Sequence, residues 1–250
     1  MRTLIVLPTY NEAENIAPVL RAIRSSAPAA DVLVVDDNSP DGTADLAERL
    51  AAELGQVKVL RRPGKEGLGR AYCAGFAVGL AEGYEILIEM DADLSHDPTD
   101  LPSLITAVEH GADLAIGSRY VPGGAIPEWS WHRKALSRWG NRYAAAVLGL
   151  GVNDATSGFR AYRATTLADV DLGEVRSDGY GFQVELTFKA VRNGAKVWEI
   201  PISFVDRQQG ESKMSPQIVV EALGHVTRWG LRDVVTLRRF RRTGVGGSRR

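Results

Sequence analysis

The chain has 250 residues, 44% of them hydrophobic and 24% charged, which is typical of a globular protein and excludes disorder over most of its length. Its 30 basic and 31 acidic residues give a formal net charge of -1, which argues against a nucleic-acid binder held by bulk charge. The single cysteine, Cys73, excludes an internal disulfide framework and fits a reducing compartment. Because we find neither a long apolar run nor a signal-peptide pattern, we expect a cytoplasmic protein that can still lie on a membrane surface.

The first half of the chain alternates between two patterns. Helical patterns at 12–25, 43–54, 68–81 and 100–110 separate short apolar runs, which predict strands at 4–7, 32–35, 57–60, 85–90 and 113–116. This alternation predicts an α/β fold with a mostly parallel, Rossmann-like sheet flanked by helices. Several strands end in polar residues, and ligands of such sheets bind at the carboxyl ends of the strands. We therefore expect the functional site at that edge.

The second half is less regular. It predicts helices at 133–148 and 181–192, a strand at 196–200, and loops at 121–131, 154–163 and 206–215. Without a repeat or a linker, we divide the chain into a catalytic domain over residues 1–215 and an extension over residues 216–250. Within the extension, residues 216–242 predict a basic amphipathic helix, followed by a frayed tail. Such a helix either binds an anionic membrane or packs on the domain with a solvated basic face.

Asp91 and Asp93 follow the apolar run at 85–90. Carboxylates two residues apart on an extended segment point the same way and repel each other unless a cation lies between them. Mg²⁺ takes one or two protein carboxylates and completes its shell with water and phosphate oxygens. The pair therefore predicts a site for a metal ion and a diphosphate, although such pairs also occur in ordinary turns.

Two other strand ends carry groups suited to a nucleoside. Asp36 and Asp37 follow the second predicted strand, where acidic side chains can bind a ribose hydroxyl or a base edge. Tyr10 and Glu12 follow the first strand, where a ring can pack on a flat base and a carboxylate can accept hydrogen bonds from it. Both segments also read as simple turns with helix-capping residues, and the two interpretations are compatible.

Cations complete the set of polar residues at strand ends and loops. Arg119 ends a predicted strand, Arg133 and Lys134 follow a tryptophan-containing loop, and Arg207 and Lys213 lie at the two ends of the loop segment 206–213. Each one alone is more often a solvated surface charge, but together with the acids they indicate an anionic ligand. The histidines have no metal-ligand spacing and no nucleophile-elbow motif occurs, so nucleophilic catalysis is disfavoured.

Seven segments occur in the order found in the polyprenol-phosphate (dolichol-phosphate) mannosyltransferases, which belong to glycosyltransferase family 2 and have a GT-A fold. They are PTYNE at 8–12, VVDDNSPDGT at 34–43, GLGRAY at 67–72, MDADLSHDP at 90–98, GSRY at 117–120, TSGFRAYR at 156–163 and IPISFVDRQQGESK at 200–213. The resemblance covers about residues 3–215. The early segments resemble family 2 as a whole, whereas the last two together resemble the polyprenol-phosphate branch.

This resemblance implies an enzyme that transfers mannose from GDP-mannose to a polyprenyl monophosphate with inversion, using Mg²⁺ or Mn²⁺. By position in the motifs, the residues implied to hold the nucleoside of the donor are Pro8, Tyr10, Glu12, Val35 and Asp37. The implied metal ligands are Asp91 and Asp93, with Ala92 against the donor; the implied donor-phosphate residues are Arg119, Arg207 and Lys213; and the implied acceptor-phosphate residues are Arg119, Arg133 and Ser137. The implied catalytic set is Asp93, Arg119 and Arg133.

Two other functions stay open at this point: a UDP-glucose-dependent enzyme acting on the same kind of lipid, and a non-catalytic subunit that binds a nucleotide sugar. The resemblance further implies peripheral attachment to the cytoplasmic face of a membrane, and it allows for a separate integral-membrane anchoring protein. Trp129 and Trp131 beside Arg133 suit a helix at the level of the lipid headgroups, or ordinary core packing.

Overall fold

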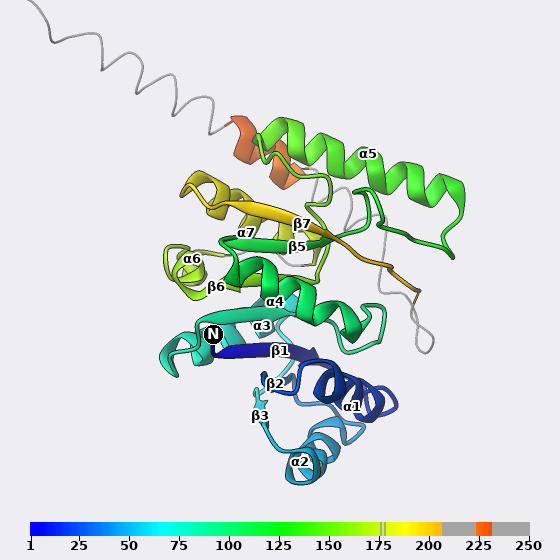
Figure 1. Cartoon of the computed structure of the whole chain (residues 1–250), viewed down its shortest axis with the longest axis vertical. Coiled ribbons are helices and arrows are strands. Elements are labelled where there is room, and N and C mark those ends of the chain that lie inside the picture. Colours follow the sequence, from blue (N-terminus) through cyan, green and yellow to red (C-terminus); the bar gives the residue numbers. More distant parts are fainter. Residues whose placement is uncertain (176, 178, 207–223, 232–250) are drawn as a thin grey trace, which may run out of the picture.

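The computed structural model of the chain describes residues 1–175, 177, 179–206 and 224–231 (Figure 1). Within these residues the strands form one seven-stranded sheet in the order β3-β2-β1-β4-β6-β5-β7. All neighbouring strands are parallel except at β6, which runs antiparallel to β4 and β5. The strands are β1 (Thr3–Thr9), β2 (Asp31–Asp36), β3 (Val57–Arg61), β4 (Ile86–Glu89), β5 (Leu114–Ser118), β6 (Arg160–Arg163) and β7 (Val197–Pro201).

Helices cover both faces of the sheet and join most of the parallel strands. The longer ones are α1 (Ile16–Ser26), α2 (Thr43–Leu54), α3 (Leu68–Ala81), α4 (Leu101–Glu109), α5 (Trp131–Leu148) and α7 (Tyr180–Arg192); the short ones are η1 (Pro98–Asp100), α6 (Ala164–Ala168) and η2 (Leu172–Glu174). In Figure 1, α5 lies beyond β7, at the end of the molecule opposite α2. The described residues contain no helix that is both long and apolar enough to cross a membrane.

The hydrophobic core has two layers, one on each face of the sheet. Along β1, Ile5 and Leu7 face a layer shared with α1, α2 and α4, whereas Leu4 and Val6 face a layer shared with α3, α5 and α7. This alternation follows from the two-residue period of a strand. Because both faces are covered, the central strands are continuous apolar runs, which is why the sequence predicted them well.

Two glycines of α3 let that helix approach the sheet closely. A β-carbon on Gly75 would lie 2.3 Å from a methyl group of Val6, and one on Gly79 would lie 2.2 Å from a methyl group of Leu87. Both distances are far below van der Waals contact, so alanine at either position would force the helix away from the sheet. The same helix carries Tyr72, whose position against the strand ends depends on this close packing.

The α/β architecture expected from the sequence is confirmed, with two differences in detail. The expectation that residues 154–163 form only a loop is wrong at its end, because these residues contain β6. Arg160 is fully buried there and bonds to the carbonyl oxygens of Ala155, Ser157 and Gln183 and to Thr187, which a hydropathy pattern cannot reveal. The first helix begins at Ile16 and not at residue 12, because Asn11 has a positive φ and a turn precedes the helix.

Only part of the predicted C-terminal helix falls on described residues. Residues 224–231 are helical, and the rest of the extension lies outside the described residues. Trp229 stacks on Phe188 of α7, and a β-carbon on Gly230 would lie 2.5 Å from a methyl group of Val147 on α5. This short helix therefore packs on the domain beside α5 (Figure 1, orange).

Candidate active site

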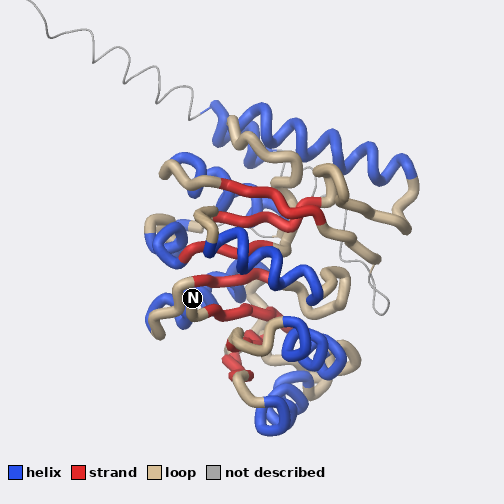
Figure 2. The backbone as a smooth tube through the Cα atoms, in the orientation of Figure 1, coloured by secondary structure: helices blue, strands red, loops and turns tan. Residues whose placement is uncertain are grey.

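The carboxyl ends of β2, β1 and β4 place the predicted donor residues side by side. The register of β1 and β2 pairs Pro8 with Val35 and Thr9 with Asp36, so the two polar segments that follow leave the sheet together. Strand β4 lies on the other side of β1, and Asp91 follows it. Figure 2 shows the loops leaving this edge of the sheet. The nucleoside and metal residues implied by the motifs thus share one edge.

Strained backbone is concentrated in these same segments. Among the described residues, four other than glycine have a positive φ, and three of them, Asn11, Asn38 and Leu94, lie in the segments after β1, β2 and β4. A leucine in this conformation costs about 1–3 kcal/mol, so the surrounding contacts must hold it in place. Strain of this kind is typical of functional sites, because it fixes the direction of neighbouring side chains.

Asp36 and Asp37 have different surroundings. Asp36 accepts hydrogen bonds from Thr9 and from the backbone and hydroxyl of Ser39, so it holds the turn together. Asp37 forms an ion pair with Arg62 in which both side chains are less than a tenth exposed. Burial raises the pKa of Asp37, although the Arg62 guanidinium acts in the opposite direction. Asp36 therefore stabilises the turn through these hydrogen bonds, whereas the Asp37 side chain pairs with Arg62, which lies outside the turn.

Tyr10 and Glu12 lie beside Asp37 at the end of β1. The Lys65 ammonium lies 4.3 Å from the centre of the Tyr10 ring, where a cation is attracted to the ring face. Glu12 is buried and accepts a hydrogen bond from the Asn15 side chain at 2.8 Å. Both side chains are held at the strand ends. A flat ligand that packs on Tyr10 would contact the same ring as the Lys65 ammonium.

Asp91 and Asp93 are each oriented by a hydroxyl group. The Tyr72 hydroxyl donates to Asp91 Oδ1 at 3.0 Å, and the Ser95 hydroxyl donates to Asp93 Oδ1 at 2.6 Å. Ala92, between them, is buried. No cluster of three or more His, Cys, Asp or Glu side chains able to hold a metal occurs in the described part of the chain. Two oriented carboxylates fit Mg²⁺ or Mn²⁺ that takes its other ligands from a diphosphate and water.

A third acid lies directly behind this pair. Glu89 is fully buried at the end of β4, and the Tyr162 hydroxyl donates to its Oε1 at 3.0 Å. Burial raises the pKa of Glu89 to about 8, even though Arg160 acts in the opposite direction. Burial therefore favours the neutral, protonated form of this carboxyl group beside Asp91.

Arg119 is held at the end of β5 by a buried ion pair. Its Nε and Nη2 donate to the two carboxylate oxygens of Asp154 at 2.7 Å, and Nη2 also donates to Thr156 Oγ1 at 2.9 Å. Both side chains are almost inaccessible to solvent. Although burial acts to raise it, the Arg119 guanidinium keeps the pKa of Asp154 below its usual value. The ion pair with Asp154 therefore holds the Arg119 guanidinium in one orientation at the end of β5.

The loop before β6 connects this arginine to the carboxylate pair. Thr156 bonds to Arg119, and two residues later a β-carbon on Gly158 would lie 3.6 Å from Asp91 Oδ2. Two residues of extended chain span at most about 7 Å. Arg119 and Asp91 therefore both lie next to this short loop.

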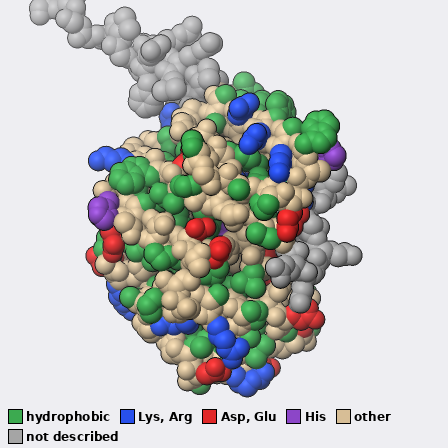
Figure 3. Space-filling model, turned by 45° about the vertical axis from the view of Figure 1, so that its right-hand side comes forward, with side chains coloured by type: hydrophobic (Ala, Val, Ile, Leu, Met, Phe, Trp, Pro, Cys, Tyr) green, Lys and Arg blue, Asp and Glu red, His purple; other side chains and the backbone are tan. Residues whose placement is uncertain are grey.

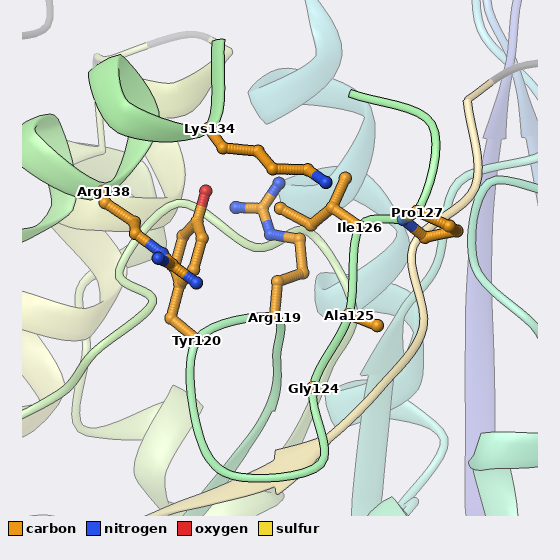
Figure 4. A pocket seen from close by; sticks show the side chains of 8 residues that line it. All are labelled: Arg119, Tyr120, Gly124, Ala125, Ile126, Pro127, Lys134 and Arg138. Carbon is orange, nitrogen blue, oxygen red and sulfur yellow. The ribbon is translucent and has the colours of Figure 1, made fainter. Parts of the chain in front are cut away.

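Arg119 also lines a cavity of about 270 Å³ (Figure 4). Its polar lining consists of Arg119 and Tyr120 with Lys134 and Arg138 of α5, and its remaining lining is Gly124, Ala125, Ile126 and Pro127. In Figure 4 the Lys134 and Arg119 head groups approach each other across the cavity. Sequence reasoning noted Lys134 only as a neighbour of Arg133 and missed Arg138, although the two lie four residues apart on a predicted helix.

Arg133 and Ser137 do not line this cavity. Arg133 lies 3.9 Å from the centre of the Trp129 ring and donates to Asp206 Oδ2 at 2.8 Å. Ser137 accepts a hydrogen bond from the Tyr120 hydroxyl at 2.6 Å. The structure thus places both residues beside the cavity wall. Arg207 and Lys213 lie outside the described residues.

Known proteins resemble this chain in sequence and in fold. The family described as Glycosyl transferase family 2 matches residues 4–170. An undecaprenyl-phosphate mannosyltransferase of Micrococcus luteus is 54% identical over 92% of this chain and 95% of its own length. A polyprenol monophosphomannose synthase of Mycolicibacterium smegmatis is 50% identical over 92% of this chain and 88% of its own length.

Among solved structures, a glucosyl-3-phosphoglycerate synthase of Mycobacterium tuberculosis in complex with Mn²⁺, UDP-glucose and phosphoglyceric acid superposes with a TM-score of 0.65. The match covers 90% of this chain and 79% of the other at 20% identity, so it shows a common GT-A fold and no more. The two curated relatives are each at least 50% identical to this chain over 92% of its length. Their similarity narrows the assignment from the family to one of its branches. The chain therefore belongs to glycosyl transferase family 2 and, within it, to the polyprenol-phosphate mannosyltransferases.

Proposed function

We propose that the protein transfers mannose from GDP-mannose to a polyprenyl monophosphate, with GDP as the leaving group and inversion at the anomeric carbon. The observation that carries this proposal is that residues 156–158 contact both parts of the site. Gly158 lies next to Asp91, whose carboxylate Tyr72 orients, and Thr156 bonds to Arg119, which lines the cationic cavity. The names of the two relatives point to the same acceptor and the same sugar.

In this proposal the nucleoside of the donor lies at the ends of β1 and β2. Tyr10 packs on the base, and Glu12 and Asp37 accept hydrogen bonds from the base or ribose, while Pro8 and Val35 form the buried floor. Asp37 has first to exchange part of its pairing with Arg62. The diphosphate then points toward Asp91 and Asp93, with Ala92 against the sugar.

Asp91 and Asp93 are the residues that would hold Mg²⁺ or Mn²⁺, which when bound neutralises negative charge on the leaving diphosphate. Arg207 and Lys213 are proposed to add positive charge from the segment that follows Asp206. Burial favours the neutral form of the Glu89 carboxyl group, which limits the negative charge beside Asp91.

The acceptor needs no strong general base. The second pKa of a phosphate monoester is about 6, so the lipid phosphate is already an anion at neutral pH. What it needs is positive charge to hold one oxygen in line with the anomeric carbon. Arg119, fixed by Asp154, is the residue best placed to do this. Ser137, which accepts a hydrogen bond from Tyr120, and Arg133, which pairs with Asp206, lie nearby on α5 and are proposed to support it. Direct in-line attack inverts the configuration and gives a β-linked product.

The surface of α5 supports attachment to a membrane. Trp131, Leu136 and Trp139 are each more than half exposed, and α5 carries several basic side chains and no acidic one. Figure 3 shows hydrophobic and basic side chains together at the end of the molecule where α5 lies. Tryptophans among basic residues favour the interface of an anionic bilayer. We propose that α5 brings the cavity to the lipid headgroups, with the extension over residues 216–250 as a second contact.

The proposal is tested with purified protein, labelled GDP-mannose, Mg²⁺ or Mn²⁺ and a polyprenyl phosphate, by counting label in the organic phase. We expect label there and its loss when a chelator is added. Label from UDP-glucose and none from GDP-mannose would keep the fold and reaction type but change the donor. Tight binding of GDP-mannose without transfer to any lipid would favour a non-catalytic subunit.

A further inference from the structure

We propose that Lys134 and Arg138 of α5 bind the phosphate of the acceptor and make the enzyme select a doubly charged phosphate monoester. This inference rests on the proposed function and adds two residues to it that the sequence motifs do not supply. It starts from the cavity beside Arg119, whose lining includes both side chains (Figure 4).

The spacing on the helix brings the two cations to one place. Residues four apart on an α-helix lie on the same face, one turn above the other. Lys134 and Arg138 therefore reach the same cavity, which Arg119 enters from the end of β5. The Arg138 guanidinium lies 5.5 Å from the centre of the Tyr120 ring, and the Tyr120 hydroxyl donates to Ser137. The ring thus forms a fixed platform beneath Arg138.

The pairing of the charges distinguishes Lys134 and Arg138 from the neighbouring arginines. Arg119 is paired with Asp154, and Arg133 with Asp206. Within the part of the chain that the structure describes, neither Lys134 nor Arg138 is in an ion pair, and no acidic side chain lines the cavity. Two cations facing one cavity without a counter-ion favour an anionic ligand with several oxygens.

The shape of the cavity points to a monoester with an apolar tail. Its volume of about 270 Å³ is small, and Ala125, Ile126 and Pro127 form an apolar wall that lies across from Arg138 and Tyr120 in Figure 4. A phosphate can face Lys134 and Arg138 while the first carbons attached to it lie against that wall. On this assignment Ser137 acts by orienting Tyr120, and Arg133 by holding Asp206, so both are positioning residues of the acceptor site.

The test compares Lys134→Gln and Arg138→Gln with Arg142→Gln. Arg142 is exposed one turn further along α5 and does not line the cavity, so its substitution is a matched control. Loss of one charged contact should raise KM for polyprenyl phosphate about tenfold or more. KM for GDP-mannose should stay within about twofold, as should both constants in Arg142→Gln. The charge-conserving variants Lys134→Arg and Arg138→Lys should recover most of the acceptor affinity.

A second readout needs no donor and no turnover. Geranyl phosphate, a short and soluble monoester, is titrated into the protein by calorimetry, with geraniol and inorganic phosphate as comparisons. We expect binding of geranyl phosphate, none of geraniol, and about tenfold weaker binding in Lys134→Gln and Arg138→Gln. Inorganic phosphate that binds as tightly as geranyl phosphate would contradict the role of the apolar wall.

The inference is overturned if both glutamine variants keep the thermal stability of the wild type, the acceptor KM and the affinity for geranyl phosphate. A variant that melts early is replaced by Lys134→Met or Arg138→Met, which removes the charge and keeps a long, flexible side chain. If the wild type binds geranyl phosphate through these residues but transfers no mannose, the proposed function fails and the cavity assignment stands. If it transfers mannose with unchanged KM in both variants, the assignment fails and the function stands.

Discussion

At the scale of single residues, the site depends on side chains that orient the reactive ones. Tyr72 and Ser95 each donate to one of the two carboxylates proposed to hold a metal ion, and Asp154 holds Arg119. The sequence predicted Asp91, Asp93 and Arg119, because they lie at strand ends in recognisable motifs. It did not predict Tyr72 or Asp154, which lie 19 and 35 residues away from their partners. Partners this distant are brought together only by the packing of α3 and the loop before β6.

The first residue-scale prediction concerns Tyr72→Phe. The ring stays packed between Phe76 and Phe182, but Asp91 loses the hydroxyl that orients it. Residues that orient metal ligands are typically worth about 10- to 100-fold in metal affinity. We therefore expect Mn²⁺ to bind at least about tenfold more weakly in the presence of GDP, as measured by the electron paramagnetic resonance of free Mn²⁺.

The control for this variant is Tyr84→Phe. Tyr84 is also buried and also donates to an aspartate, Asp31. Asp31 begins β2, so it lies at the amino-terminal end of that strand, away from the candidate site. Tyr84→Phe should leave Mn²⁺ binding unchanged. Equal Mn²⁺ affinity in wild type and Tyr72→Phe would show that the hydroxyl does not position the metal ligand.

The second residue-scale prediction concerns pH and His96. The ring is buried and stacked on Phe159, and its Nδ1 has no hydrogen-bond partner among the described residues. Burial lowers the pKa of His96 to about 4. Because the unfolded chain binds the proton more tightly, the free energy of unfolding should fall as the pH drops from about 6.5 to about 4, by up to about 1.4 kcal/mol per pH unit.

Urea unfolding at several pH values measures this effect in wild type and in His96→Phe. His96→Phe should lose this part of the pH dependence of the free energy of unfolding. His110→Gln should keep it, because His110 is exposed. A slope in His96→Phe equal to that of the wild type would mean that His96 titrates normally in the folded protein.

At the scale of elements, α5 has two apolar faces with different partners. Ala144 and Leu148 pack into the core, while Trp131, Leu136 and Trp139 face outward. The sequence predicted this helix correctly from its periodicity but left open which tryptophans are buried. The structure divides them: Trp129 is buried and donates to Asp206, and Trp131 is 78% exposed. Burial of this kind depends on which elements meet, and local sequence does not record that.

The prediction at this scale is that Trp131→Ala combined with Trp139→Ala weakens binding to vesicles of phosphatidylcholine and phosphatidylglycerol in equal amounts. Removing two large aromatic side chains from the interface should reduce co-sedimentation at least about tenfold. Thermal stability should change little, because both side chains are exposed.

The matched control is Trp198→Ala, since Trp198 is an exposed tryptophan on β7 and not on α5. It should sediment with the vesicles as the wild type does. If the α5 double variant still binds vesicles normally, attachment depends on another part of the chain, such as residues 216–250.

At the scale of the whole molecule, the sheet brings the proposed donor residues and Arg119 to the same end of its strands. The order β3-β2-β1-β4-β6-β5-β7 sets the proposed nucleoside residues at the ends of β2 and β1, the proposed metal carboxylates after β4, and Arg119 after β5. The antiparallel strand β6 lies between β4 and β5, so its leading loop reaches both Asp91 and Arg119. The alternating pattern predicted the parallel strands. It missed β6, because a strand with a buried arginine looks polar.

The most direct test of this account is mannose transfer by the wild-type chain to a polyprenyl phosphate compared with the polyprenol of the same length. Both lipids offer the same apolar tail, and only the first offers an anion to Arg119 and the α5 cations. We predict labelled mannose in the lipid phase with the phosphate and background label with the alcohol. Equal labelling of both lipids would contradict the account, because the reaction would then not depend on the acceptor phosphate.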